Sequence, residues 1–211
     1  MFNASIKWIK VYSAAVALLC TTLMGIGLAT RASADVWNKK TIVTFNTPVE
    51  VPGKALPAGT YVFKLLDSPS NRHIVQIYDK DEKQLYATIL AIPDYRLQPS
   101  GEPVLNFEER PAGTPPALRA WFYPGDNYGQ QFVYPQSRAT QLAKANKHNV
   151  LSMPDNMEKH VTATAKPAID STPAPNVVAL QKTEVIGVDK SGNPVRLEET
   201  ILFTAPDTKK L

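Results

Sequence analysis

The sequence predicts an all-β protein: an antiparallel β-sandwich or partly open barrel, with one short helix and a flexible C-terminal extension that contains a β-hairpin. Two observations predict this class. Between residues 35 and 135, short runs rich in Val, Ile, Thr, Tyr and Phe alternate with Pro, Gly, Asp and Asn, which is the pattern of strands and turns. No long amphipathic helical pattern separates the runs, so parallel βαβ units are not expected.

Alternation within the runs identifies the expected strands. In residues 60–66, Tyr61, Phe63 and Leu65 fall on one face and Lys64 on the other, as in a strand with one solvated side. The expected strands are residues 41–46, 49–51, 60–66, 73–78, 85–92, 104–108, 118–123 and 131–134. After Pro135, apolar residues recur at helical spacing and predict one short helix at 136–146.

Composition then divides the rest of the chain. Residues 35–149 form the predicted β domain, and residues 150–180 are rich in Pro, Ala and Thr and predict a linker. Residues 181–205 contain two β-like runs around a polar, glycine-containing turn and predict a hairpin. Since a lone hairpin is marginal in water, it docks on the β domain, pairs with another chain or stays partly mobile.

The first 34 residues have the order of a secretory signal peptide. Lys7 and Lys10 precede an uncharged apolar stretch at 11–29, and Ala32-Ser33-Ala34 fits signal peptidase. We therefore expect cleavage near Ala34 and an extracytoplasmic location, in the periplasm, on the cell surface or in the medium. The apolar stretch is also long enough to cross a bilayer, so retention of residues 11–29 as a membrane anchor is the alternative.

Removal of this segment changes both the thiol content and the charge. Cys20 is the only cysteine and lies within the segment, so the mature chain is expected to contain neither a disulfide nor a cysteine nucleophile. Three of the 23 basic residues and none of the 19 acidic ones lie there, which leaves a net charge of +1. Without a basic cluster, nucleic acid is not an expected partner.

Few residues suggest catalysis, and the sequence predicts no metal site and no cofactor. Glycine-rich phosphate loops and serine nucleophile elbows are absent. Glu108 and Glu109 are adjacent, and on a strand their side chains would point to opposite faces, so they could not flank one glycosidic bond. A hydrolase that uses Asp126 or Glu109 together with His73 is one alternative function.

The most informative stretch runs from Trp121 to Pro135 and places six aromatic residues within fifteen. Two interpretations stay open. The rings fill the core, or some form an exposed platform that stacks on sugar rings or on an apolar patch of a partner. The candidate ligand-binding residues are Trp121, Tyr123, Asp126, Asn127 and Tyr128.

Two motifs carry a resemblance to known proteins. Leu56-Pro57-Ala58-Gly59-Thr60-Tyr61 and the stretch from Trp121 to Pro135 resemble a group of exported bacterial proteins that each consist of a signal peptide and one β domain. The resemblance covers roughly residues 35–150. It implies export and β structure, and no activity is assigned to the group.

These observations favour an exported, non-catalytic binding or structural protein of the cell envelope or the secreted fraction. Its expected partner is an envelope protein or a polysaccharide. A carbohydrate-binding module that uses the exposed aromatics of 121–134 is the first alternative, and the hydrolase is the second.

Overall fold

The structure is a computed structural model that describes residues 39–66, 73–108, 110–111, 113–161 and 174–198. All of these residues belong to one compact unit. The predicted signal peptide at 1–34 lies outside the described residues, and so does Glu109. Of the helices that the structure describes, none has the length and apolar character needed to cross a membrane.

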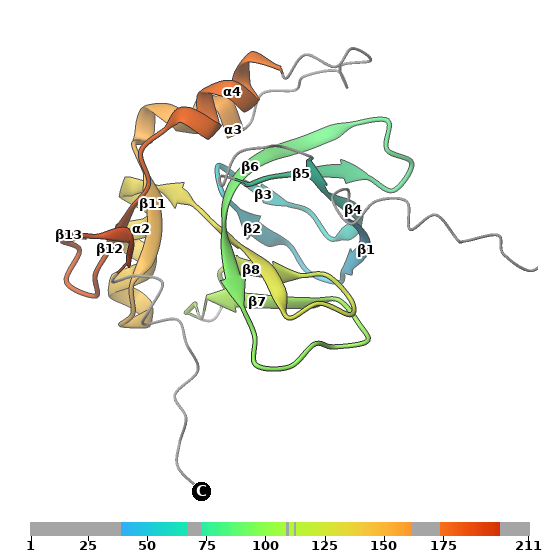
Figure 1. The fold of residues 1–211 in the computed structure, drawn as a ribbon, viewed down its shortest axis with the longest axis horizontal. Coiled ribbons are helices and arrows are strands. Elements are labelled where there is room, and N and C mark those ends of the chain that lie inside the picture. The colour runs from blue at the N-terminus through green and yellow to red at the C-terminus, as the bar shows by residue number, and fades with distance from the viewer. Residues whose placement is uncertain (1–38, 67–72, 109, 112, 162–173, 199–211) are drawn as a thin grey trace, which may run out of the picture. The chain divides into compact units, whose positions relative to one another are not determined.

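The largest element of the structure is a nine-stranded sheet (Figure 1). The strands follow the order β1-β4-β5-β6-β9-β8-β2-β3, and β7 pairs with β8 outside this path. The bounds are β1 Lys40–Phe45, β2 Val49–Val51, β3 Lys54–Leu56, β4 Gly59–Leu66, β5 His73–Asp79, β6 Leu85–Tyr95, β7 Val104–Glu108, β8 Ala117–Phe122 and β9 Tyr128–Phe132. The pairs in this sheet are antiparallel, apart from the parallel pair of β2 with β8.

Within the described residues, a second, four-stranded sheet follows, together with the helical segments α2, η1, α3 and α4. The strands are β10 Tyr134–Pro135, β11 Val150–Met153, β12 Ile186–Val188 and β13 Pro194–Val195, and β10 runs parallel to β11. The helical segments are α2 Gln136–Asn146, the 3₁₀ turn η1 Asp155–Met157, α3 Glu158–Val161 and α4 Pro175–Lys182. Helix α2 contacts the second sheet, whereas α3 and α4 contact β6 of the large sheet.

The all-β class is confirmed. Seven of the eight expected strands occur with shifts of up to three residues at their ends, and the helix at 136–146 matches α2. The eighth, expected at 131–134, is divided between the end of β9 and the start of β10, which belong to different sheets. β3 was not expected, because Lys54-Ala55-Leu56 is too short to show an alternating pattern. In the structure, only Leu56 of these three residues is buried. Helices α3 and α4 were also not expected.

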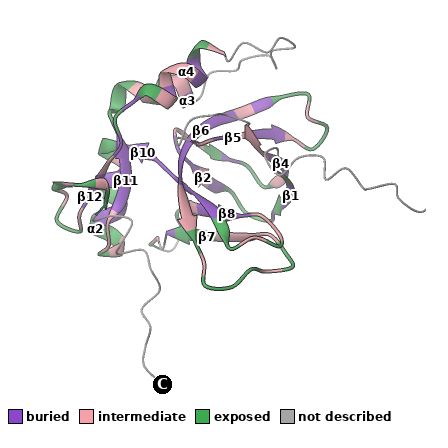
Figure 2. Cartoon of the chain, viewed as in Figure 1, coloured by how far each residue is buried: buried purple, intermediate pink, exposed green. Residues whose placement is uncertain are grey.

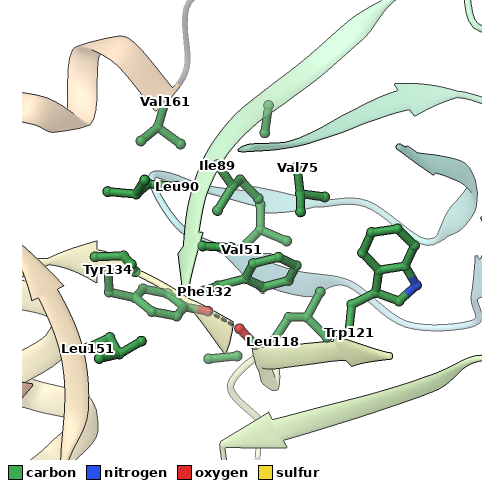
Figure 3. Close-up of a cluster of buried hydrophobic side chains, with 14 of the residues drawn as sticks. Val51, Val75, Ile89, Leu90, Leu118, Trp121, Phe132, Tyr134, Leu151 and Val161 are labelled. Atoms are coloured by element: carbon green, nitrogen blue, oxygen red, sulfur yellow. Dashed lines mark hydrogen bonds between the residues drawn. The ribbon is translucent and has the colours of Figure 1, made fainter. Parts of the chain in front are cut away.

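Alternating side chains bring one face of the sheet into a single core (Figures 2 and 3). Strand β1 alternates exposed and buried residues, with Thr41, Val43 and Phe45 inward. The ring of Phe45 lies 6.5 Å from that of Phe107 on β7, so the sheet curls until β1 faces β7 through side chains. Among the described residues no backbone pairing joins these two strands, so the barrel stays partly open.

Helix α2 is fixed to the large sheet by an ion cluster around Glu50 on β2. Arg138 of α2 donates from Nε to Glu50 Oε1 and from Nη2 to Oε2, both at 2.5 Å. Arg110 donates from Nη1 to Oε2 at 2.6 Å. These two arginines lower the pKa of Glu50, although its burial acts in the opposite direction and is the largest influence on it. A bidentate arginine contact of this kind fixes orientation as well as distance.

The linker predicted for 150–180 is wrong at both ends. Residues 150–153 form β11, all of whose side chains are buried, and 158–161 and 175–182 form α3 and α4. Large apolar residues are sparse here, but Leu151, Val161, Val177 and Leu180 all pack in the core. The average composition of 150–180 predicted no packed structure, because composition does not show which of the few apolar side chains are buried. The middle of the predicted linker, 162–173, lies outside the described residues.

The predicted C-terminal hairpin is β12 and β13, and it docks on the rest of the unit. β12 pairs antiparallel with β11, so the hairpin extends the second sheet. Its turn is held by Asp189, whose Oδ1 accepts hydrogen bonds from the backbone N–H groups of Ser191 and Asn193, both at 2.8 Å. Gly192 provides the positive φ of 91° that the turn requires. Residues 199–205 of the predicted hairpin lie outside the described residues.

Candidate functional site

The five residues proposed as a contact surface do not form one platform. Trp121 belongs to the buried cluster shown in Figure 3 and is 1% exposed. Its ring packs edge-on against that of Phe63, with 5.9 Å between the ring centroids. Phe122, Phe132 and Tyr134 are also buried. Most rings of this stretch therefore fill the core, and Trp121 has no surface on which a ligand could stack.

The exposed ring of the stretch is Tyr128, and it pairs with a residue that the sequence did not single out. Tyr128 lies at the start of β9 opposite Tyr95 at the end of β6. Tyr95 donates its hydroxyl hydrogen to the Tyr128 oxygen at 2.8 Å, and the rings meet at 73° with centroids 4.4 Å apart. Tyr95 is 58% exposed and Tyr128 37%. We call these two residues the tyrosine pair.

The hydroxyl contact within the tyrosine pair also sets its protonation. The hydrogen bond with Tyr95, followed by partial burial, raises the pKa of Tyr128 to about 12. The phenol of Tyr128 therefore stays neutral at physiological pH, and its oxygen accepts the hydrogen bond that fixes one ring against the other.

Tyr123, Asp126 and Asn127 have local structural contacts. Lys39 forms an ion pair with Asp126 and lies over the ring of Tyr123, 5.3 Å from its centroid. Asn127 is exposed, and its backbone carbonyl accepts a hydrogen bond from the N–H of Arg96 at 2.8 Å. The loop between β8 and β9 is thus tied both to the start of β1 and to the segment that follows β6.

A hollow of about 560 Å³ lies beside the tyrosine pair and shares Tyr95 with it. Its wall combines charged and amide side chains with the apolar surfaces of Leu97 and Phe122. The residues that line it are Asp94, Tyr95, Arg96, Leu97, Gln98, Asn106, Arg119 and Phe122. They come from the end of β6 and the segment after it, and from β7 and β8. We refer to this feature as the hollow.

Arg96 is positioned by the buried ring of Phe122. Its guanidinium carbon lies 5.2 Å from the ring centroid, a cation–π distance. Phe122 in turn packs against Gly129, where a Cβ would come within 2.4 Å of the ring atom Cδ1. Only glycine leaves room for this ring, so the residue at 129 determines where Phe122, and with it Arg96, can lie.

The charges around the hollow are unevenly paired. Asp94 is half-buried, and this burial raises the pKa of its carboxyl group, opposed by a hydrogen bond from the Tyr95 N–H and by the charge of Arg119. The Nη1 atom of Arg96 and the Nε atom of Arg119 are buried with no hydrogen-bond partner within the described part of the chain. The nearest ion-pair partner of Arg119 is Glu108, at 3.9 Å.

Glu108 itself is held by a histidine. Its carboxylate is 2% exposed, and Oε2 lies 2.6 Å from Nε2 of His148. The contact with Glu108 raises the pKa of His148 despite the opposing effect of burial. Nδ1 of His148 lies 2.9 Å from the carbonyl oxygen of Asn149, to which it can only donate. Both ring nitrogens therefore face acceptors, and the imidazolium form satisfies both.

The structure does not bring the proposed hydrolase residues together. Asp126 pairs with Lys39, and Nδ1 of His73 lies 2.7 Å from Oε1 of Gln130. Glu109 lies outside the described residues. The pairing of Glu108 with His148, the tyrosine pair and the hollow were all missed from the sequence. The only local signal was the aromatic residue Tyr95 at the end of a predicted strand, and the partner of each group comes from a distant segment.

Comparisons with known proteins add no assignment to this geometry. No protein-family model, no curated protein and no solved structure matches the chain. Within the residues that the structure describes, no group of three or more His, Cys, Asp or Glu side chains could hold a metal ion. The functional proposal therefore depends on the contacts around the tyrosine pair and the hollow.

Proposed function

We propose that the chain is an exported, non-catalytic binding protein of the cell envelope or the secreted fraction, and that it binds a polysaccharide at the tyrosine pair and the hollow. The observation that carries the proposal is the juxtaposition of an exposed pair of rings with a hollow that contains charged and amide side chains, at the same strand end. The signal-like order of residues 1–34 supports the export.

The chemistry of a sugar matches both features. The C–H faces of a pyranose ring pack against aromatic rings, and its hydroxyl groups need hydrogen-bonding partners. The tyrosine pair offers ring surface at a fixed angle, and the hollow offers amide, carboxyl and guanidinium groups on Gln98, Asn106, Asp94 and Arg119. Because the rings are already ordered by their mutual hydrogen bond, binding loses little side-chain entropy.

Three ionisable groups that the sequence or the structure suggests as catalytic candidates are already held by protein contacts. A general base needs a free nitrogen or carboxylate within reach of the substrate. Both nitrogens of His148 already face protein acceptors, and Glu108 is 2% exposed. Asp126 is held by Lys39. Each of these groups has a structural partner that would have to be displaced before it could act on a substrate.

Two measurements test the proposal. Cell fractionation of the producing organism should place the chain outside the cytoplasm. In affinity electrophoresis through gels that contain envelope polysaccharide, the full chain should be retarded, Tyr95→Ala and Tyr128→Ala should lose the retardation, and Tyr128→Phe should keep it because the ring remains.

Ile42→Ala serves as the matched control. Ile42 lies on β1 and is 64% exposed, so this substitution also removes exposed apolar surface but does so away from the site. Its mobility should equal that of the wild type. Unchanged retardation of both tyrosine variants, or a cytosolic location of the full-length chain, would overturn the proposal.

A further inference from the structure

The hollow contains more positive than negative charge once its ion pairs are assigned. Arg96 and Arg119 both line it, and Asp94 is the one carboxyl group among its lining residues. No ion pair within 4.0 Å joins Asp94 to either arginine in the described part of the chain. Glu108, which lies nearest to Arg119, is already neutralised by His148. The hollow is therefore suited to a ligand that carries a negative charge.

The guanidinium of Arg96 is also ordered before any ligand arrives. Its backbone N–H bonds to the carbonyl of Asn127, and its guanidinium lies over Phe122. A guanidinium held over an aromatic ring keeps its planar edge of N–H donors, and that edge matches the two oxygens of a carboxylate.

We infer that the hollow binds a carboxylate-bearing sugar residue of an acidic polysaccharide, with Arg96 and Arg119 facing the carboxylate and Tyr95 facing the sugar ring. This inference rests on the proposed function and specifies its substrate class. The two arginines distinguish a uronate from a neutral sugar, whereas the tyrosine pair contacts the sugar ring of either. Variants of the two sets therefore report on different parts of the site.

The test is affinity electrophoresis of the full chain in gels that contain polygalacturonate, with dextran as the neutral polymer. The wild type should be retarded by polygalacturonate at physiological salt and not by dextran. Arg96→Gln and Arg119→Gln should each weaken the retardation about 10-fold or more, as expected when a charge-assisted hydrogen bond is lost. Arg96→Lys should also weaken it, because lysine keeps the charge but not the planar edge.

Lys54→Gln is the matched control. Lys54 lies over the ring of Tyr86 at 5.4 Å, so the variant removes a cation from an aromatic ring outside the hollow. It should leave the retardation unchanged. Thermal unfolding of each variant shows whether the fold is intact, and Arg96→Lys keeps the test decisive if Arg119→Gln unfolds.

Several results would overturn the inference. Equal retardation by dextran and polygalacturonate would show that the carboxylate is not recognised, and an equal effect of Lys54→Gln would show attraction by net charge alone. If inorganic phosphate competes with the polymer as well as galacturonate does at equal ionic strength, the hollow recognises a phosphate and not an acidic sugar. If Tyr95→Ala and Tyr128→Ala abolish binding while the arginine variants do not, this inference fails and the proposed function stands.

Discussion

Replacing His148 with glutamine removes the cation that faces the buried carboxylate of Glu108. The Glu108 side chain is 2% exposed, so its negative charge cannot gain much hydration in the variant. Removing one partner of a buried ion pair costs about 3–5 kcal/mol. The His148 side chain is 32% exposed and Arg119 remains 3.9 Å from Glu108, so we expect the lower end of that range, about 3 kcal/mol.

The same pair predicts how stability depends on pH. The pKa of His148 is raised in the folded protein above its ordinary value of 6.5 by the contact with Glu108. Between pH 6.5 and the raised pKa, the folded state holds a proton that the unfolded chain has released. The stabilisation is therefore fully present below pH 6.5 and is lost as the pH rises through the folded pKa. His148→Gln should lose this part of the pH dependence.

Urea unfolding at pH 5.5, 7 and 9 provides the measurement, with Glu108→Gln and the double variant completing a cycle. We expect the double variant to cost less than the sum of the single variants by about 1–3 kcal/mol, because the second change removes a charge that the first left unpaired. Additivity within about 0.5 kcal/mol at pH 5.5 would refute the coupling. An unchanged pH dependence in His148→Gln would refute the assigned titration.

Three further substitutions test the contacts that shape the site and its support, each measured by the urea midpoint. Gly129→Ala should cost about 1–3 kcal/mol, because its Cβ would overlap the ring of Phe122, and a neutral result would show that the ring moves freely. Tyr134→Phe should cost about 1–3 kcal/mol by leaving the carbonyl of Leu118 without its 2.8 Å bond, and an unchanged midpoint would contradict this. Glu50→Gln should cost about 1–3 kcal/mol and speed amide exchange in α2, whereas unchanged exchange would mean that packing alone holds the helix.

Local patterns were enough to predict most of the strands and the helix. Alternation in residues 60–66 depends only on neighbours two positions apart, and it placed Tyr61 and Phe63 correctly in the core. The helix at 136–146 has the expected bounds because both of its ends are determined locally: it begins directly after Pro135 and ends before Lys147, which adopts the left-handed conformation. Composition was a poorer guide in 150–180, where a few apolar residues reach the core of a distant sheet.

The candidate site could not be predicted in the same way, because the tyrosine pair, the hollow and the pairing of His148 with Glu108 each join residues from segments that are distant in the sequence. Alternation puts Trp121 and Tyr123 on one face, but it does not say which face is covered. Tyr128 meets Tyr95 only because β9 pairs with β6 in one register, and a shift of one residue would place another side chain there. A single sequence carries no signal for such a pairing, nor for the contact of His148 with Glu108.

The register of β6 and β9 explains why the exposed rings lie at the strand ends. The pairs Ala91–Phe132, Pro93–Gln130 and Tyr95–Tyr128 follow one another along the same face of the sheet. Phe132 is in the core, Gln130 is buried and bonded to His73, and Tyr128 is exposed. Each step of two residues moves outward from the core, so the last pair is supported by the sheet and stays partly exposed among the residues that the structure describes. The proposed ligand would therefore meet rings at the exposed end of the paired strands, so we expect variants of this pair to change binding more than they change the free energy of unfolding.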